Sequence, residues 1–202
     1  MGEVLAEEQA AGVPGFLAAA AEGITVTMID VDELVKRNAG FAAGRSFAGL
    51  RLSPSGSLQV MGCVDPRVDP ADVLGLELGE AAVIRNVGGR VVPATLRTLR
   101  MLSKVVQARG GRPQGDFHYA VLHHTDCGIK DLAAFPELLA EYFEIPVGDV
   151  DAKAVTDPVA AVRIDVEVLK QEVAAGVFVS GLVHDVATGL VETIVPPTRV
   201  KG

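Results

Sequence analysis

Residues 58–67 read LQVMGCVDPR, a short apolar run that ends in a thiol, a carboxylate and a guanidinium. Because loop-like segments flank LQVMGCV (58–64), we predict a buried strand there. If the chain stays extended beyond it, Cys63, Asp65 and Arg67 project to one side. The Asp–Arg pair can then form a bidentate ion pair, although such pairs are also common on ordinary surfaces.

The rest of the chain alternates predicted strands with predicted helices. Strands are expected at 81–87 and 117–124, and a strand–turn–strand unit at 177–195. Helices are expected at 3–22 with a break at Pro14, and at 30–48, 70–76, 93–108, 131–143 and 157–175. This alternation predicts an α/β fold with a central, mostly parallel β-sheet flanked by helices. Ligands in such folds bind beyond the carboxyl ends of the strands.

Two segments stand at the carboxyl ends of predicted strands. The first contains Cys63, and the second reads HHTDCG (123–128), at the end of the predicted strand 117–124. His124 and Cys127 have the H-x-x-C spacing that lets an imidazole and a thiolate reach one cation, and Zn²⁺ prefers these ligands. Adding Cys63 gives three protein ligands and one open position, the pattern of catalytic zinc sites. The two cysteines are also compatible with inert burial, a single bridge or a redox pair. His123 is expected to point to the opposite face, as a core residue.

Composition excludes several classes of protein. The 202-residue chain carries a net charge of −8, has no basic tract and is 4% aromatic, which disfavours nucleic-acid binding. No apolar run approaches the ~20 residues that span a bilayer, and the acidic start lacks the features of a signal peptide. We therefore expect a cytoplasmic protein with a single domain, 1–202, that begins with a helical arm over 1–50.

Three motifs in order resemble the β-class carbonic anhydrases, in particular their small prokaryotic and fungal branch. They are CVDPRVDP (63–70), VIRNVGG (83–89) and HTDCG (124–128). The resemblance covers at least 58–130, the expected zinc-site core, whereas the terminal strands over 177–195 fit it less specifically. It implies the same α/β fold, the reversible hydration of CO₂ to bicarbonate, and a homodimer or higher homo-oligomer.

The resemblance also implies roles for individual residues. The three cysteine and histidine residues named above would bind one Zn²⁺ per chain, and Asp65 and Arg67 would form the catalytic pair. Asp65 would also take the fourth zinc position in a closed state. Val87 and Gly128 match positions that line the family's substrate pocket. Pro54 stands near the place where plant-type members carry a substrate-binding glutamine.

Two alternatives of different kinds stay open from the sequence. A carbonyl sulfide or carbon disulfide hydrolase would use the same zinc motif with a different pocket. A non-enzymatic, zinc-stabilised binding domain would have no need of the pair formed by Asp65 and Arg67. A redox protein is a third and more remote reading, because the two cysteines are 64 positions apart and form no C-x-x-C motif.

Overall fold

The computed structural model describes residues 29–110 and 117–202. The helix predicted at 3–22 lies outside the described residues. The chain divides into two compact units, Met1–Ala48 and Gly49–Gly202, and each is described by itself. The organisation of the chain as one domain with an N-terminal arm stays a prediction.

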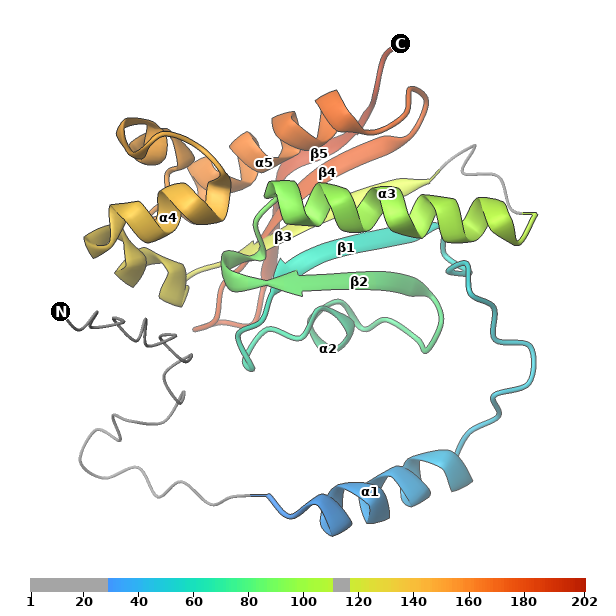
Figure 1. Ribbon diagram of the computed structural model, residues 1–202. Helices are drawn as coiled ribbons and strands as arrows, with labels where there is room; N and C mark the ends of the chain where they lie inside the picture. Colours follow the sequence, from blue (N-terminus) through green and yellow to red (C-terminus); the bar gives the residue numbers. More distant parts are fainter. Residues whose placement is uncertain (1–28, 111–116) are drawn as a thin grey trace, which may run out of the picture. The chain divides into compact units, whose positions relative to one another are not determined.

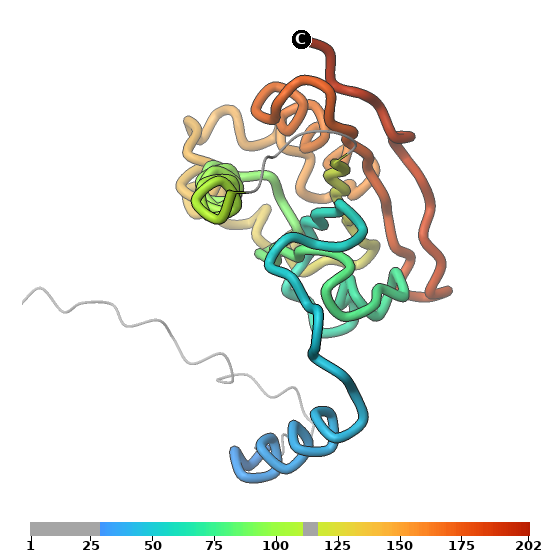
Figure 2. The backbone as a smooth tube through the Cα atoms, turned by 90° about the vertical axis from the view of Figure 1, so that its right-hand side faces the viewer, coloured from blue at the N-terminus to red at the C-terminus, as the bar shows by residue number. Residues whose placement is uncertain are grey.

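The second unit is built on a five-stranded sheet with the order β2-β1-β3-β4-β5 (Figure 1). Its strands are β1 (Leu58–Cys63), β2 (Ala81–Asn86), β3 (His118–His124), β4 (Phe178–His184) and β5 (Val191–Arg199). The first four run parallel, and β5 pairs antiparallel with β4. The predicted α/β fold with a mostly parallel sheet is confirmed. Figure 2 views α3 nearly end-on and shows the β4–β5 hairpin along one side of the unit.

Helices cover both faces of this sheet because its inner strands are apolar on both sides. On one face, Met61, Val121 and Val179 pack with apolar side chains of α5 (Pro158–Glu172) and α3 (Pro93–Ala108). On the other face, Val60 and Leu122 pack with apolar side chains of α2 (Pro70–Leu74). The central strands are thereby held between two layers, which fixes where their carboxyl ends lie.

Local sequence signals set the helix boundaries. Asp69 and Asp157 accept hydrogen bonds from the first backbone N–H groups of α2 and α5, and a proline follows each of them at the first helical position. The continuous helix predicted at 131–143 is wrong. The segment forms a 3₁₀ helix, η2 (Gly128–Ala134), and then α4 (Pro136–Phe143). Proline disfavours helical geometry in the residue before it, and Phe135 accordingly has φ −128° and ψ 65°.

Two further 3₁₀ segments complete the second unit, η1 (Val87–Gly89) and η3 (Val147–Lys153). The described part of the first unit contains α1 (Val31–Ala43), which is shorter than the predicted 30–48 and is capped by Asp30. None of the residues of α1 is buried. Among the helices in the described ranges, none is long and apolar enough to cross a membrane.

A buried ion pair connects three elements beneath the carboxyl edge of the sheet. The side chains of Arg90 and Asp165 are only 1% and 2% exposed. Arg90 Nε and Nη2 donate to the two carboxylate oxygens at 2.7 and 3.2 Å, and the Val91 N–H donates to the same carboxylate at 3.2 Å. His123 Nε2 lies 3.1 Å from it. This network ties β3 and the segment before α3 to the middle of α5.

Candidate metal centre

The inner strands separate from each other at the carboxyl edge of the sheet. Pairing between β1 and β3 ends at Gly62 and Leu122. Each strand continues to pair with its outer neighbour, Cys63 with Asn86 on β2, and His124 with His184 on β4. Cys63 and His124 therefore end adjacent strands at the point where the sheet opens.

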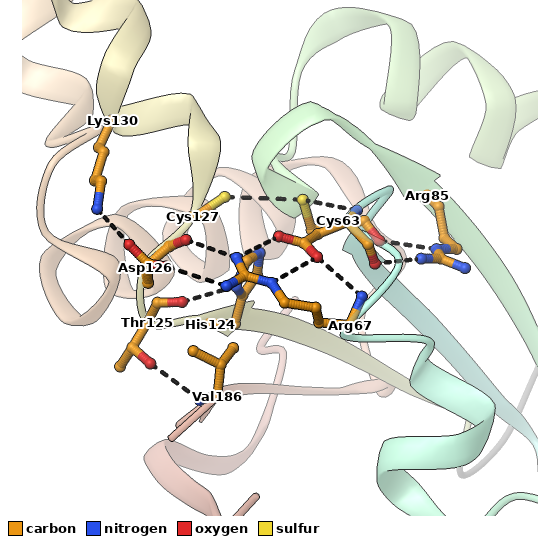
Figure 3. Close-up of polar contacts among 10 residues, drawn as sticks. Cys63, Arg67, Arg85, His124, Thr125, Asp126, Cys127, Lys130 and Val186 are labelled. Carbon is orange, nitrogen blue, oxygen red and sulfur yellow. Dashed lines mark hydrogen bonds and ion pairs between the residues drawn. The ribbon is translucent and has the colours of Figure 1, made fainter. Parts of the chain in front are cut away.

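The turn after β3 brings a third side chain to this opening. The candidate ligand atoms of Cys63, His124 and Cys127 lie within 4.8 Å of one another (Figure 3), and the two Sγ atoms are 3.8 Å apart. The turn requires a positive φ of 52° at Asp126, a conformation that Asp tolerates better than most residues. Both cysteines are free thiols. The three residues predicted as metal ligands are thus together.

A close backbone approach supports the site from the side of β2. Gly89 has a φ of 65°, and a Cβ atom at this position would lie 2.9 Å from the backbone N of Cys63 and 3.1 Å from the backbone O of Leu122. Contacts below 3.0 Å force the backbone to shift. Glycine therefore allows η1 to pack directly against the ends of both inner strands.

The orientation of His124 suits a metal ligand. Its Nδ1–H donates to the backbone oxygen of Thr125 at 2.9 Å, which fixes the tautomer and leaves the Nε2 lone pair free. The ring is buried, and Nε2 has no hydrogen-bond partner among the described residues. An imidazole nitrogen and two sulfurs are a donor set that Zn²⁺ prefers, so the residues present fit this ion.

The two sulfurs share a proton unequally. The pKa of Cys63 is lowered well below its usual range, chiefly by the hydrogen bond from the Cys127 thiol and despite burial. The N–H of Asp65 also donates to Cys63 Sγ at 3.4 Å, and this contact favours the thiolate. The pKa of Cys127 is raised by the same sulfur contact and by burial. The site therefore holds one thiolate readily, and a cation would have to displace the proton of the second thiol.

The predicted pair of Asp65 and Arg67 is formed at the edge of this group. Arg67 Nε donates to Asp65 Oδ1 at 3.1 Å and Nη2 donates to Oδ2 at 2.7 Å, the bidentate geometry that the sequence suggested. The hydrogen bonds from Arg67 lower the pKa of Asp65 to about 2, although partial burial opposes this shift. Asp65 is therefore a fixed carboxylate throughout the neutral range.

Arg85 fixes the backbone of the loop that carries Asp65 and Arg67. Its Nε donates to the carbonyl of Cys63 and its Nη2 to the carbonyl of Asp65, both at 2.8 Å, and its Nη1 binds Asp69 at 2.7 Å. These contacts tie β2 to the two residues that flank Val64. Arg85 therefore supports the site from β2.

The sequence motifs assigned no side-chain contacts to several residues at the site. Asp126 accepts from Arg67 and from Lys130, and the Tyr142 hydroxyl donates to the carbonyl of Val87 at 2.7 Å. The i,i+4 spacing of Asp126 and Lys130 is a sequence signal that indicates an ion pair between them. No sequence signal pointed to Tyr142, because its contact with Val87 spans 55 positions.

The structure places the remaining predicted residues around the site. A cavity of about 40 Å³ lies beside Cys127, and both His123 and His124 line it. The ring of His123 is buried and contacts Asp165 on α5, as expected of a core residue. Val87 and Gly128 are exposed and do not line this cavity. Their role in a substrate pocket stays a prediction.

Comparisons with known proteins agree with the sequence motifs. A family model described as carbonic anhydrase matches residues 58–141. The β-carbonic anhydrase 1 of Mycobacterium tuberculosis is 34% identical over 103 residues, which are 50% of this chain and 57% of that protein. The mitochondrial β-carbonic anhydrase 6 of Arabidopsis thaliana is 47% identical over 47 residues, 23% of this chain and 16% of that protein. The chain thus matches little more than half the length of its mycobacterial relative.

The fold extends the likeness over most of the chain. The solved carbonic anhydrase of Streptococcus mutans is 31% identical with a TM-score of 0.61, and the match covers 84% of this chain and 99% of that one. The chain belongs to the β-carbonic anhydrase family. Another solved carbonic anhydrase, from Glaciozyma antarctica, is 27% identical with a TM-score of 0.56 over 79% of this chain and 94% of that one. Family membership confirms the resemblance that the three motifs carried.

Proposed function

We propose that this chain catalyses the reversible hydration of CO₂ to bicarbonate, with one Zn²⁺ held by Cys63, His124 and Cys127. One observation carries the proposal: the three ligand atoms converge within 4.8 Å beside the bidentate pair of Asp65 and Arg67. Three protein ligands leave a coordination position open, as catalytic zinc sites require. When bound, Zn²⁺ supplies a water whose pKa is lowered from 15.7 to about 7.

The residues of the chain would then orient the reacting water. With its pKa lowered to about 2, Asp65 remains an acceptor of hydrogen bonds at neutral pH and does not act as a base. It would accept one O–H of the nucleophile and so direct a lone pair of that oxygen toward the carbon of CO₂. Arg67 keeps this carboxylate ionised and in place through two hydrogen bonds.

We assign the substrate to the exposed side of the site. The side chain of Val87 would form one apolar wall for CO₂, and Gly128, which has no side chain, would leave room beside Cys127. Tyr142 supports this arrangement, because its hydroxyl fixes the carbonyl of Val87. We also propose that Asp65 can leave Arg67 and take the fourth zinc position in a closed state. A crystal structure of the zinc-loaded protein at acidic pH tests that step.

The proposal is tested on the zinc-loaded protein by two measurements on one sample, the metal content and the rate of CO₂ hydration. We expect about one zinc per chain and rapid hydration. The release of H₂S from carbonyl sulfide, measured in parallel, tests the alternative substrate. Zinc without CO₂ hydration would contradict the proposal and would favour a zinc-stabilised binding domain.

Replacing Asp65 with asparagine is expected to lower kcat/KM for CO₂ hydration by about 100-fold, because a misplacement of reacting groups by about 1 Å can cost about 10²-fold. The amide keeps the shape of the side chain but loses the ionised acceptor. Zinc content should stay at about one per chain. The matched control is Asp72→Asn, since Asp72 is an exposed aspartate on α2. Wild-type turnover in the Asp65 variant would remove the carboxylate from the mechanism.

We further propose a cytoplasmic homodimer or larger homo-oligomer. On the outer side of α3, Met101 is 70% exposed, and Leu102 and Val105 are exposed with it. Apolar side chains gathered on one helix face are typical of a surface that another chain covers. Light scattering on the purified protein should give a mass of at least two chains, and a monomeric mass would contradict this part of the proposal.

A further inference from the structure

The guanidinium of Arg67 is held from two sides, although its side chain is 49% exposed. On one side it binds both carboxylate oxygens of Asp65. On the other side, Nη1 donates to Asp126 Oδ2 at 3.1 Å and Nη2 donates to the backbone oxygen of Asp126 at 2.9 Å. The second set of contacts comes from the turn between His124 and Cys127 (Figure 3).

The second set of contacts restrains the guanidinium of Arg67 from outside its own loop. An exposed ion pair between two side chains is weak, because water screens it and long side chains lose freedom in forming it. Asp65 and Arg67 are two positions apart on one loop, and Arg85 ties the backbone of that loop to β2 at Asp65, but neither contact joins the loop to the turn after β3. The contacts with Asp126 join it to the turn after β3.

Asp126 is itself held in place. Its Oδ1 accepts from Lys130 Nζ while its Oδ2 accepts from Arg67, so the two oxygens have separate partners. Lys130, Asp126, Arg67 and Asp65 thus form a row of alternating charges that ends at the carboxylate of the catalytic pair.

We propose that Asp126 is a positioning residue for the reaction, which acts through Arg67 on Asp65 and is supported by Lys130. The inference rests on the proposed function, since it gives Asp126 a part in orienting the reacting water. In this role Asp126 acts through Arg67 and not on the substrate itself. It joins the loop of the catalytic pair to the turn that carries two of the metal ligands.

The central variant is Asp126→Ala in the full-length, zinc-loaded protein. We expect kcat/KM for CO₂ hydration to fall about tenfold while zinc content stays at one per chain. Asp126→Asn should restore most of the activity, because asparagine keeps an acceptor oxygen and tolerates the positive φ. Lys130→Met should lower activity by a smaller factor. Asp131→Ala is the matched control, because it removes the same charge from the adjoining 3₁₀ helix η2 and should leave activity unchanged.

A double-mutant cycle separates positioning from a general structural effect. In an Arg67→Ala background, Asp126→Ala should cause no further loss of kcat/KM, since the guanidinium that Asp126 positions is absent. An equal factor in both backgrounds, or the loss of zinc in Asp126→Ala, would overturn the proposal. Full activity in the single variant would do so as well.

A second measurement does not depend on the proposed activity. The Arg67 Nε–H gives an NMR signal that can be assigned by its disappearance in Arg67→Lys. Hydrogen exchange at this group should be at least about tenfold faster in Asp126→Ala than in wild type or in the Asp131 control. An unchanged exchange rate would contradict the positioning role. A protein without CO₂ hydration in which this exchange still accelerates would instead contradict the proposed function alone.

Discussion

Serine in place of Cys127 is expected to remove bound zinc and CO₂ hydration together. A serine hydroxyl remains protonated at neutral pH, so the site keeps only the imidazole of His124 and the sulfur of Cys63, too few ligands for tight binding. Zinc content should fall from about one per chain to near zero, and kcat/KM by at least about a thousandfold. Cys63→Ser should behave in the same way.

The control for this experiment is Val64→Ala. Val64 is exposed and lies between Cys63 and Asp65, but it is not one of the three candidate metal ligands. It should retain zinc and activity. Thiol titration adds a test that does not depend on turnover, because bound zinc should protect both cysteines of the wild-type protein from alkylation. A serine variant that keeps one zinc per chain would show that the ligand assignment is wrong.

Replacing Asp165 with leucine is expected to lower the free energy of unfolding by about 3–5 kcal/mol, because it leaves the buried charge of Arg90 unpaired. The effect also has a pH dependence. Burial raises the pKa of Asp165, but the hydrogen bond from His123 and the charge of Arg90 outweigh it, and the net shift is downward. Asp165 therefore stabilises the wild type above about pH 4, its unfolded pKa, and this contribution is lost as the pH falls through the lower folded pKa.

Urea unfolding at several pH values measures both effects. The difference in stability between wild type and Asp165→Leu should be largest near neutral pH and shrink in acid. The double variant Arg90→Met with Asp165→Leu should recover part of the loss, because no unpaired charge remains in the interior. A double variant less stable than the single one would mean that Arg90 stabilises the fold through contacts other than this ion pair.

The sequence predicted that Cys63, His124 and Cys127 come together because the signals were local. Cys63 and His124 each end an apolar run that reads as a buried strand, and Cys127 follows at ligand spacing. Parallel strands place their carboxyl ends at one edge of a sheet, so the meeting of the three residues followed from the fold class. Asp65 and Arg67 lie two positions apart, and their pairing needed only an extended loop.

What the sequence did not reveal depends on contacts between distant segments. Arg90 and Asp165 are 75 positions apart, and neither belongs to a motif that would link them. The start of α4 is a different case. Pro136 was visible, but the apolar pattern on both sides of it suggested one helix, and the restriction that proline places on Phe135 decides the outcome.

The separation of the inner strands has a consequence for the protein without metal. At the carboxyl edge the backbone ladder still joins Val64 to Asn86 and Thr125 to His184, but no ladder bond joins β1 to β3 there. A cation bound by both Cys63 and the turn after β3 would link the two strands at the point where they share no backbone hydrogen bond. Without it, the sheet should begin to fray at this end. Amide hydrogen exchange would then rise first beside the site, while the core strands stay protected.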